Sequence, residues 1–91
     1  MYQQIFELHA DLLKALSHPK RLEVVNLLRD KGLNVGEMQE MLGLPQANLS
    51  QHLMVLREAG VVETEKKGKE VFYKLTSKNF VKASDLLREG L

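Results

Sequence analysis

Residues 44 to 62, LPQANLSQHLMVLREAGVV, constrain the fold more than any other stretch of this 91-residue chain. Leu49, Leu53 and Leu56 recur at the spacing of one helix face, which predicts an amphipathic helix with a buried apolar stripe. Gly60 follows the last apolar turn and is expected to stop this helix. The segment therefore predicts a short turn, one helix and the start of a strand.

The other side of this helix carries short, neutral side chains with hydrogen-bonding groups, where a surface helix more often carries Glu and Lys. Such side chains reach base edges in a DNA major groove without the bulk of long charged ones. Gln46 or Gln51 can pair with an adenine, and Ala47 can contact a thymine methyl. His52 lies beside Leu53, so that packing and DNA contact both stay open for it. The candidate base-reading residues are Gln46, Ala47, Asn48, Ser50, Gln51 and His52.

Three helices are expected before this segment, over residues 2 to 16, 19 to about 29, and 35 to about 43. Pro19 suits the first position of the second helix, and Lys31-Gly32 is expected to close it. Asn34 with Glu37 three residues later predicts a capping box for the third. Two short helices joined by a tight turn with glycine are typical of a helix-turn-helix.

Past residue 60 the apolar period becomes that of a strand. Residues 61 to 65 and 70 to 75 flank Lys67-Gly68-Lys69, which predicts a hairpin. Val71, Tyr73 and Leu75 share one face of it and are expected to meet the helical core. Thr76 or Ser77 should then cap a last helix that runs to about residue 88. The predicted class is mainly α with a small β-hairpin, ordered α-α-α-α-β-β-α, in one domain over residues 1 to 91.

The net charge of +1 does not by itself indicate a nucleic-acid partner, but basic residues gather at the predicted hairpin tip. Lys66, Lys67 and Lys69 surround Gly68 there. Phosphate contact by these lysines is one interpretation. A solvated hairpin tip is the other, and on charge alone it is the commoner case.

Several functions are excluded by what the chain lacks. With no cysteine, it has no disulfide, no thiol redox chemistry and no zinc site built on thiolates. No catalytic serine–histidine–carboxylate spacing and no phosphate-binding glycine loop occurs, and Ser50 beside His52 is too weak a pair, so neither an enzyme nor a cofactor is expected. The N-terminus does not resemble a signal peptide, and the longest apolar run, residues 53 to 56, is far short of the roughly 20 residues that span a bilayer. We expect a cytoplasmic protein without a membrane partner.

Methionine and histidine side chains can form ligand sites, but in this chain a structural interpretation is simpler. Met38 and Met41 are interpreted as core residues rather than as the lining of a pocket. His18, between the first two helices, is interpreted as structural, with a phosphate contact as the alternative. His9, on the first helix, could meet Asp85 or Glu89 of a second copy in a weak metal or proton site, although a solvated or packed histidine is favoured.

Three motifs over residues 12 to 75 together resemble the ArsR/SmtB family of winged-helix repressors. LLKALSHPKRLEVVNLL is similar to the family's opening motif, LNVGEMQEMLGLPQANLSQHLMVLREAGVV to its helix-turn-helix, and KKGKEVFYKL to its wing. The resemblance implies a homodimer that binds an inverted repeat in an operator, on double-stranded DNA, and blocks transcription. Its first and last helices would pair across the dimer axis, and the candidate interface residues are Ile5, Phe6, Leu12, Phe80 and Leu87.

The chain departs from the family at the metal sites. Members that sense arsenic, cadmium or lead have cysteines near the position of Val35, where this chain has Asn34 and Gly36. Zinc-sensing members use a carboxylate-x-His pair and a further histidine in the last helix, and residues 77 to 91 contain no histidine. We therefore expect no metal site, and we expect that zinc, cadmium, arsenite and peroxide do not release the protein from DNA. The effector stays unknown.

An alternative is a winged helix that binds another protein and no DNA. Such a surface would more often expose aromatic side chains. The neutral polar face of residues 46 to 51 and the lysine-rich tip favour DNA instead.

Overall fold

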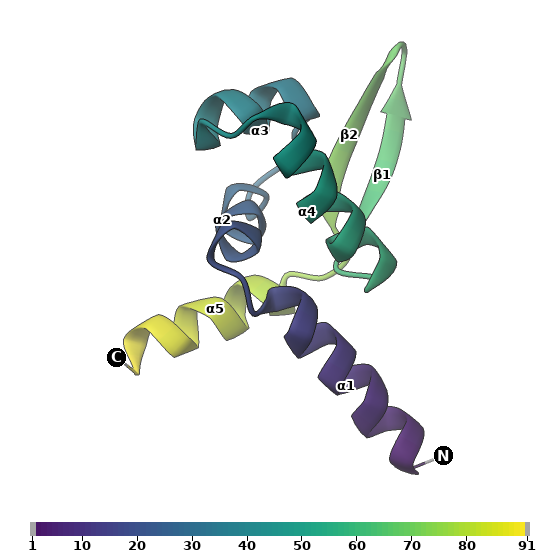
Figure 1. Cartoon of the computed structure of the whole chain (residues 1–91), viewed down its shortest axis with the longest axis vertical. Coiled ribbons are helices and arrows are strands. Elements are labelled where there is room, and N and C mark those ends of the chain that lie inside the picture. The colour runs from purple at the N-terminus through teal and green to yellow at the C-terminus, as the bar shows by residue number, and fades with distance from the viewer. Residues whose placement is uncertain (1, 91) are drawn as a thin grey trace.

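The computed structural model describes residues 2–90, so that Met1 and Leu91, the ends of the predicted domain, lie outside the described residues. The elements are α1 (Tyr2–Leu16), α2 (Pro19–Leu27), α3 (Val35–Leu42), α4 (Gln46–Glu58), β1 (Val62–Lys67), β2 (Glu70–Leu75) and α5 (Asn79–Glu89). This order confirms the predicted mainly α class with a hairpin. At one end of the molecule lie α3, the start of α4 and the hairpin tip, whereas α1 and α5 extend from the other end (Figure 1).

The core lies where α2, α3 and α4 meet the base of the hairpin. Its buried members are Val24, Val25, Leu28, Leu33, Met38, Leu49, Leu53, Leu56, Val61, Val62 and Val81. The three leucines of the predicted α4 stripe are therefore all buried, as expected. Met38 is also fully buried, but the prediction that Met41 is a core residue is wrong, because Met41 is 61% exposed. Met41 lies in the last turn of α3 and lines a surface groove beside Leu42 instead of entering the core.

The capping box at the start of α3 is confirmed. The Asn34 side chain accepts the N–H of Glu37 at 2.8 Å, and the Glu37 carboxylate accepts the N–H of Asn34 at 3.0 Å. The helix ends at Gly43, whose φ of 65° is the left-handed conformation that favours glycine. These local signals fix the turn that leads directly into α4.

The end of α2 differs from the prediction. The helix ends at Leu27, and residues 28 to 31 form a turn rather than a last helical turn closed by Lys31-Gly32. The carbonyl of Arg29 accepts a hydrogen bond from the Lys78 ammonium, and the Arg29 guanidinium bonds Asp85 of α5 at 2.9 Å. Because these partners are distant in sequence, the boundary could not be read from local residues.

Gly32 instead permits a close approach between the turn and the hairpin. Leu33 and Tyr73 exchange backbone hydrogen bonds of 3.0 and 2.8 Å, which tie β2 to the segment before α3. A Cβ at position 32 would lie 3.1 Å from the carbonyl oxygen of Tyr73. The absence of a side chain therefore lets the hairpin join the helical body.

The hairpin itself pairs antiparallel from Val62 opposite Leu75 to Lys67 opposite Glu70. Tyr73 and Leu75 pack against the core as expected. The same prediction is wrong for Val71, which is 44% exposed, because the hairpin has by that point extended beyond the helices.

The start of α5 also needs a correction. Its cap position is Lys78, which makes no side-chain cap bond. The Ser77 hydroxyl oxygen does accept the N–H of Asn79 at 3.1 Å, but the Thr76 hydroxyl turns back and donates to the carbonyl of Gly60 at 2.7 Å. Thr76 therefore fastens the end of α4 to the end of the hairpin instead of capping α5.

Two arginines pair with Asp85 on α5: Arg29, from the turn after α2, and Arg88, one turn later on α5 itself. Arg29 and Arg88 both donate to its Oδ1, and these hydrogen bonds hold the pKa of Asp85 below its ordinary value. Asp85 is therefore ionised at neutral pH and links α5 to the turn after α2.

Candidate nucleic-acid interface

The predicted base-reading residues lie mainly on the exposed side of α4. Gln46, Ala47, Asn48, Ser50 and Gln51 are all exposed, opposite the buried leucine stripe. A shallow hollow of about 280 Å³ is lined by Ala47, Asn48, Gln51 and His52. The structure thus brings these four together, while Gln46 and Ser50 lie outside the hollow.

One residue on this surface is absent from the sequence prediction. Met54 is half exposed and follows Ala47 and Gln51 at spacings of four and three residues. Residues at this spacing share one side of a helix. The helical period could therefore have identified Met54 as a member of the outward stripe.

The N-terminus of α4 is open to an anion. Its cap residue is Pro45, with no side-chain cap bond, and the first turn contains no acidic side chain. The first backbone N–H groups of a helix have no partner within the helix, and they carry the positive end of its dipole. A phosphate is a suitable partner for such an end.

His52 packs inward, against the start of α2. Its ring centroid lies 4.6 Å from that of His18, and its Nδ1 is buried without a hydrogen-bond partner. Burial is the main cause that lowers the pKa of His52, and the charges of His18 and Arg21 add to it. Packing is thus observed for His52, and a DNA contact stays a prediction.

His18 has the structural role predicted for it. It occupies the cap position of α2, where its Nδ1 accepts the N–H of Lys20 at 3.1 Å. The neighbouring Arg21 Nε donates to the carbonyl of Ala15 at 2.5 Å, which ties the end of α1 to α2. Phosphate contact by His18 stays a prediction.

The three predicted lysines are exposed around the hairpin tip, where Gly68 has a φ of 63°. The strand register places Lys66 opposite Val71 and Lys67 opposite Glu70. Adjacent strand residues point to opposite faces, so that Lys66 and Lys67 leave the ribbon on different sides. The Lys67 ammonium lies 5.9 Å from the centre of the Phe72 ring, at cation–π distance.

Below the tip the hairpin carries one lysine and two glutamates, and so no excess of positive charge. Lys74 lies between Glu65 at 3.2 Å and Glu63 at 3.7 Å. The hydrogen bond that Lys74 donates to Glu65 is the largest cause that raises the pKa of Lys74. The unbalanced positive charge of the hairpin is therefore confined to residues 66 to 69.

The candidate dimer residues lie at the other end of the molecule, on α1 and α5 (Figure 1). Ile5, Phe6 and Leu87 are exposed, whereas Leu12 and Phe80 are half-buried and line a common groove. Within residues 2–90, no three histidine, aspartate or glutamate side chains gather as a metal site would require. No helix in the same range is long and apolar enough to cross a membrane.

Comparison with known sequences gives a consistent family. A family described as "Bacterial regulatory protein, arsR family" matches residues 18–64. The biofilm growth-associated repressor of Xylella fastidiosa is 51% identical over 67 residues, which cover 74% of this chain and 59% of that protein. The transcriptional activator HlyU of Vibrio cholerae is 47% identical over 66 residues, which cover 72% of this chain and 61% of HlyU. The chain thus spans about three fifths of the length of these relatives.

Solved structures agree with this result. Reduced HlyU from Vibrio cholerae superposes with a TM-score of 0.83 and 38% identity, over 97% of this chain and 93% of that one. A homodimeric winged helix-turn-helix domain from Mycobacterium bovis, a possible ArsR-family regulator, has a TM-score of 0.86 over 96% of this chain and 81% of that one; at 22% identity it shows the fold alone. The chain is a winged helix-turn-helix protein and belongs to the ArsR family of bacterial transcriptional regulators.

Proposed function

We propose that this protein is a homodimeric, sequence-specific repressor that binds an inverted repeat in an operator. The observation that carries the proposal is one surface that combines a neutral polar helix face with a cationic hairpin tip. Both lie at the same end of the molecule (Figure 1). Base edges are read by short polar groups, and the DNA backbone is held by positive charge.

In this arrangement α4 enters the major groove by its N-terminal turns. Gln51 and Gln46 offer an amide that pairs with adenine, and Ala47 offers a methyl for thymine. Asn48 and Ser50 flank these residues, and Met54 extends the apolar contact along the outward stripe. The backbone N–H groups after Pro45 and the lysines of the tip neutralise phosphates on either side.

The orientation of α5 supports a dimer. Its inner side holds Val81, buried in the core, and Asp85, paired with Arg29. Its outer side carries Leu86 and Leu87, which are 67% and 68% exposed. A helix that attaches to its own body partly through an ion pair and leaves leucines outside has an apolar face for another helix to cover.

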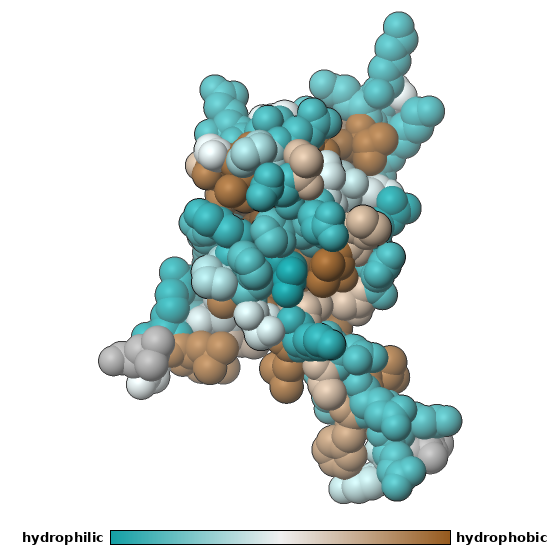
Figure 2. Space-filling view, in the orientation of Figure 1, coloured by the Kyte–Doolittle hydropathy of each residue, from teal (hydrophilic) through white to brown (hydrophobic). Residues whose placement is uncertain are grey.

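The first helix, α1, also has apolar side chains that its own body leaves uncovered, because its residues 2 to 10 are all exposed. In the space-filling view, brown and tan patches lie on the surface of this helix and of α5 among hydrophilic side chains (Figure 2). A groove of about 390 Å³ between the two helices has an almost wholly apolar lining: His9, Leu12, Leu13, Leu16, Asn79, Phe80 and Ala83. A helix of a second copy suits this groove, and the partner's α1 and α5 carry the same apolar surface.

Two-fold symmetry then sets the form of the DNA site. Two recognition helices reach successive major grooves when their centres are about 34 Å apart, which corresponds to half-sites one helical turn apart. A dimer that covers a promoter at such a site blocks transcription. The relatives include both a repressor and an activator. The position of the operator relative to the promoter therefore decides whether binding represses or activates transcription.

The proposal is tested by a mobility-shift titration on DNA from just upstream of the gene that encodes the protein. We expect a retarded complex that survives an excess of scrambled competitor DNA of the same length. A dimer and one inverted repeat should give a single retarded band. Competition by scrambled DNA as effective as by the upstream DNA would contradict sequence-specific binding and favour a protein-interaction module instead.

A further inference from the structure

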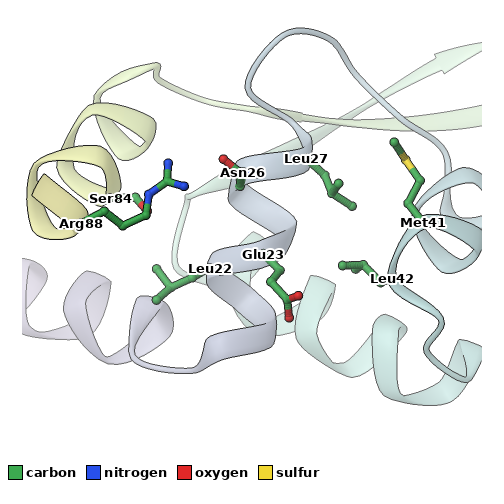
Figure 3. A pocket seen from close by; sticks show the side chains of 8 residues that line it. All are labelled: Leu22, Glu23, Asn26, Leu27, Met41, Leu42, Ser84 and Arg88. Carbon is green, nitrogen blue, oxygen red and sulfur yellow. The ribbon is translucent and has the colours of Figure 1, made fainter. Parts of the chain in front are cut away.

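A second groove lies over the outer face of α2, between α3 and the C-terminal half of α5. It has a volume of about 360 Å³ and is lined by Leu22, Glu23, Asn26, Leu27, Met41, Leu42, Ser84 and Arg88. Figure 3 shows α2 in the middle, with Ser84 and Arg88 on one side of it and Met41 and Leu42 on the other. This volume is at the lower end of the range for small-molecule sites.

The lining divides into an apolar part and a polar end. Leu27, Met41 and Leu42 form the apolar part, on the α3 side (Figure 3). Met41 is 61% exposed, and a flexible thioether beside two leucines adapts to apolar groups of varied shape. At the other end the Arg88 guanidinium points towards Asn26 (Figure 3).

Charge decides which ligand class suits the polar end. Asp85 Oδ1 accepts from both Arg29 and Arg88, so that one carboxylate serves two guanidinium groups. Arg88 can therefore bind a second carboxylate while Arg29 continues to hold Asp85. Glu23, the acidic residue of the lining, points away from Arg88 and is paired with Lys20 at 3.0 Å.

We propose that this groove is an effector site for a small amphipathic organic acid, whose carboxylate pairs with Arg88 and whose apolar body lies on Leu27, Met41 and Leu42. Asn26 and Ser84 flank the carboxylate with further hydrogen-bonding groups. The effector role, though not the binding, rests on the DNA-binding function proposed above.

A second copy of the chain is a poorer occupant. The groove uses the side of α5 that faces α2, with Ser84 and Arg88, whereas the outward leucines Leu86 and Leu87 are absent from its lining. The surface assigned to the dimer is therefore separate from this groove.

The position of the groove couples it to DNA binding. One wall, α3, leads directly into the recognition helix, and the other, α5, belongs to the proposed dimer interface. An occupant that touches both walls favours one arrangement of α3 relative to α5, and so one separation of the two recognition helices. By linkage, the acid changes operator affinity by the same factor as the operator changes affinity for the acid.

The test begins without DNA, so that binding is measured independently of the proposed function. The probes are octanoate and 4-phenylbutyrate, with octanamide as the neutral control, titrated into the full chain with ¹³C-methyl NMR detection. We expect saturable shifts of the Met41, Leu27 and Leu42 methyls with the acids. Arg88→Gln should weaken octanoate binding about tenfold, because a charge-assisted pair is lost, and leave octanamide unchanged. Lys82→Gln, an exposed cation on α5 outside the groove, is the matched control.

The DNA step follows with the operator identified by the mobility shift. Saturating octanoate should change the operator Kd at least about fivefold in the wild type and not in Arg88→Gln, as expected for a coupling of ordinary size. No methyl shifts with either acid up to millimolar concentration, or equal binding to Arg88→Gln, would overturn the site. Methyl contacts with residues of a second copy would assign the groove to the dimer instead. Acid binding without any operator binding would support the binding site. It would contradict the proposed DNA-binding function and, with it, the effector role.

Discussion

At the scale of single residues, we propose that DNA recognition depends on two exposed glutamines of α4. Replacing Gln51 or Gln46 by Ala should cost about 1–3 kcal/mol at the operator and relax the preference at one base pair, while non-specific binding hardly changes. Gln3→Ala, an exposed glutamine on α1, is the matched control. Fluorescence anisotropy on operator and scrambled DNA measures both quantities. Equal losses on the two DNAs would contradict base reading.

His52 predicts a pH dependence of stability. Its pKa in the folded protein lies below the ordinary value of 6.5, because burial, His18 and Arg21 disfavour the charged ring. The unfolded chain therefore takes up the proton more readily than the folded one. The contribution of neutral His52 to stability is complete above pH 6.5 and is lost as the pH falls below 6.5 towards the folded-state pKa.

Urea unfolding between pH 7.5 and about 5 measures this effect. His52→Gln should reduce the fall in unfolding free energy over that range, since glutamine does not titrate. Gln3→Ala, an exposed substitution that removes no titratable group, is the control and should leave the fall unchanged. An identical fall in the wild type and in His52→Gln would contradict the assignment to His52.

At the scale of elements, the hairpin should act as a source of non-specific affinity. Changing Lys66, Lys67 and Lys69 together to Ala should weaken binding to every DNA sequence. Each lost phosphate contact should make the slope of log K against log salt shallower by about 0.9. Lys82→Ala on α5 is the control for the loss of a positive charge away from the hairpin. An unchanged slope in the triple variant would restore the interpretation of a solvated hairpin tip.

The elements themselves were largely predictable because their signals are local. The capping residues Asn34 and Glu37 mark the start of α3, and the leucine period of α4 identifies its buried face. The end of α2 was missed; Arg29, just beyond it, bonds Lys78 and Asp85 from the other end of the chain. The residues near the end of α2 do not reveal contacts with residues so distant in the sequence.

The surface features were less predictable than the helices. Periodicity assigned Val71 and Met41 to the core, but burial also depends on whether a neighbouring element covers the position. The hairpin extends past the helices at Val71, and α3 overhangs a groove at Met41. Because that groove joins three elements, no single segment of sequence could indicate it.

At the scale of the whole molecule, the proposed function assigns separate tasks to the two ends: DNA contact at one and dimer contact at the other. The double variant Phe6→Glu with Leu87→Glu places charges on the exposed apolar faces of α1 and α5. It should sediment as a monomer, retain the helical circular dichroism of the wild type, and lose most operator affinity because two half-sites are no longer bound together.

The matched control is Met41→Lys, which charges an exposed apolar position outside the proposed interface. It should sediment like the wild type. A Phe6/Leu87 double variant that remains dimeric in analytical ultracentrifugation would show that the interface lies elsewhere.

The most direct test of the central claim is selection of bound sequences from a pool of randomised double-stranded DNA. The account predicts enrichment of one inverted repeat, with half-site centres about 10 base pairs apart, as the separation of two recognition helices requires. The same selection with Gln51→Ala should lose information at one position in each half-site. Enrichment of no motif, or of a single unpaired half-site, would contradict a dimer that reads DNA through α4.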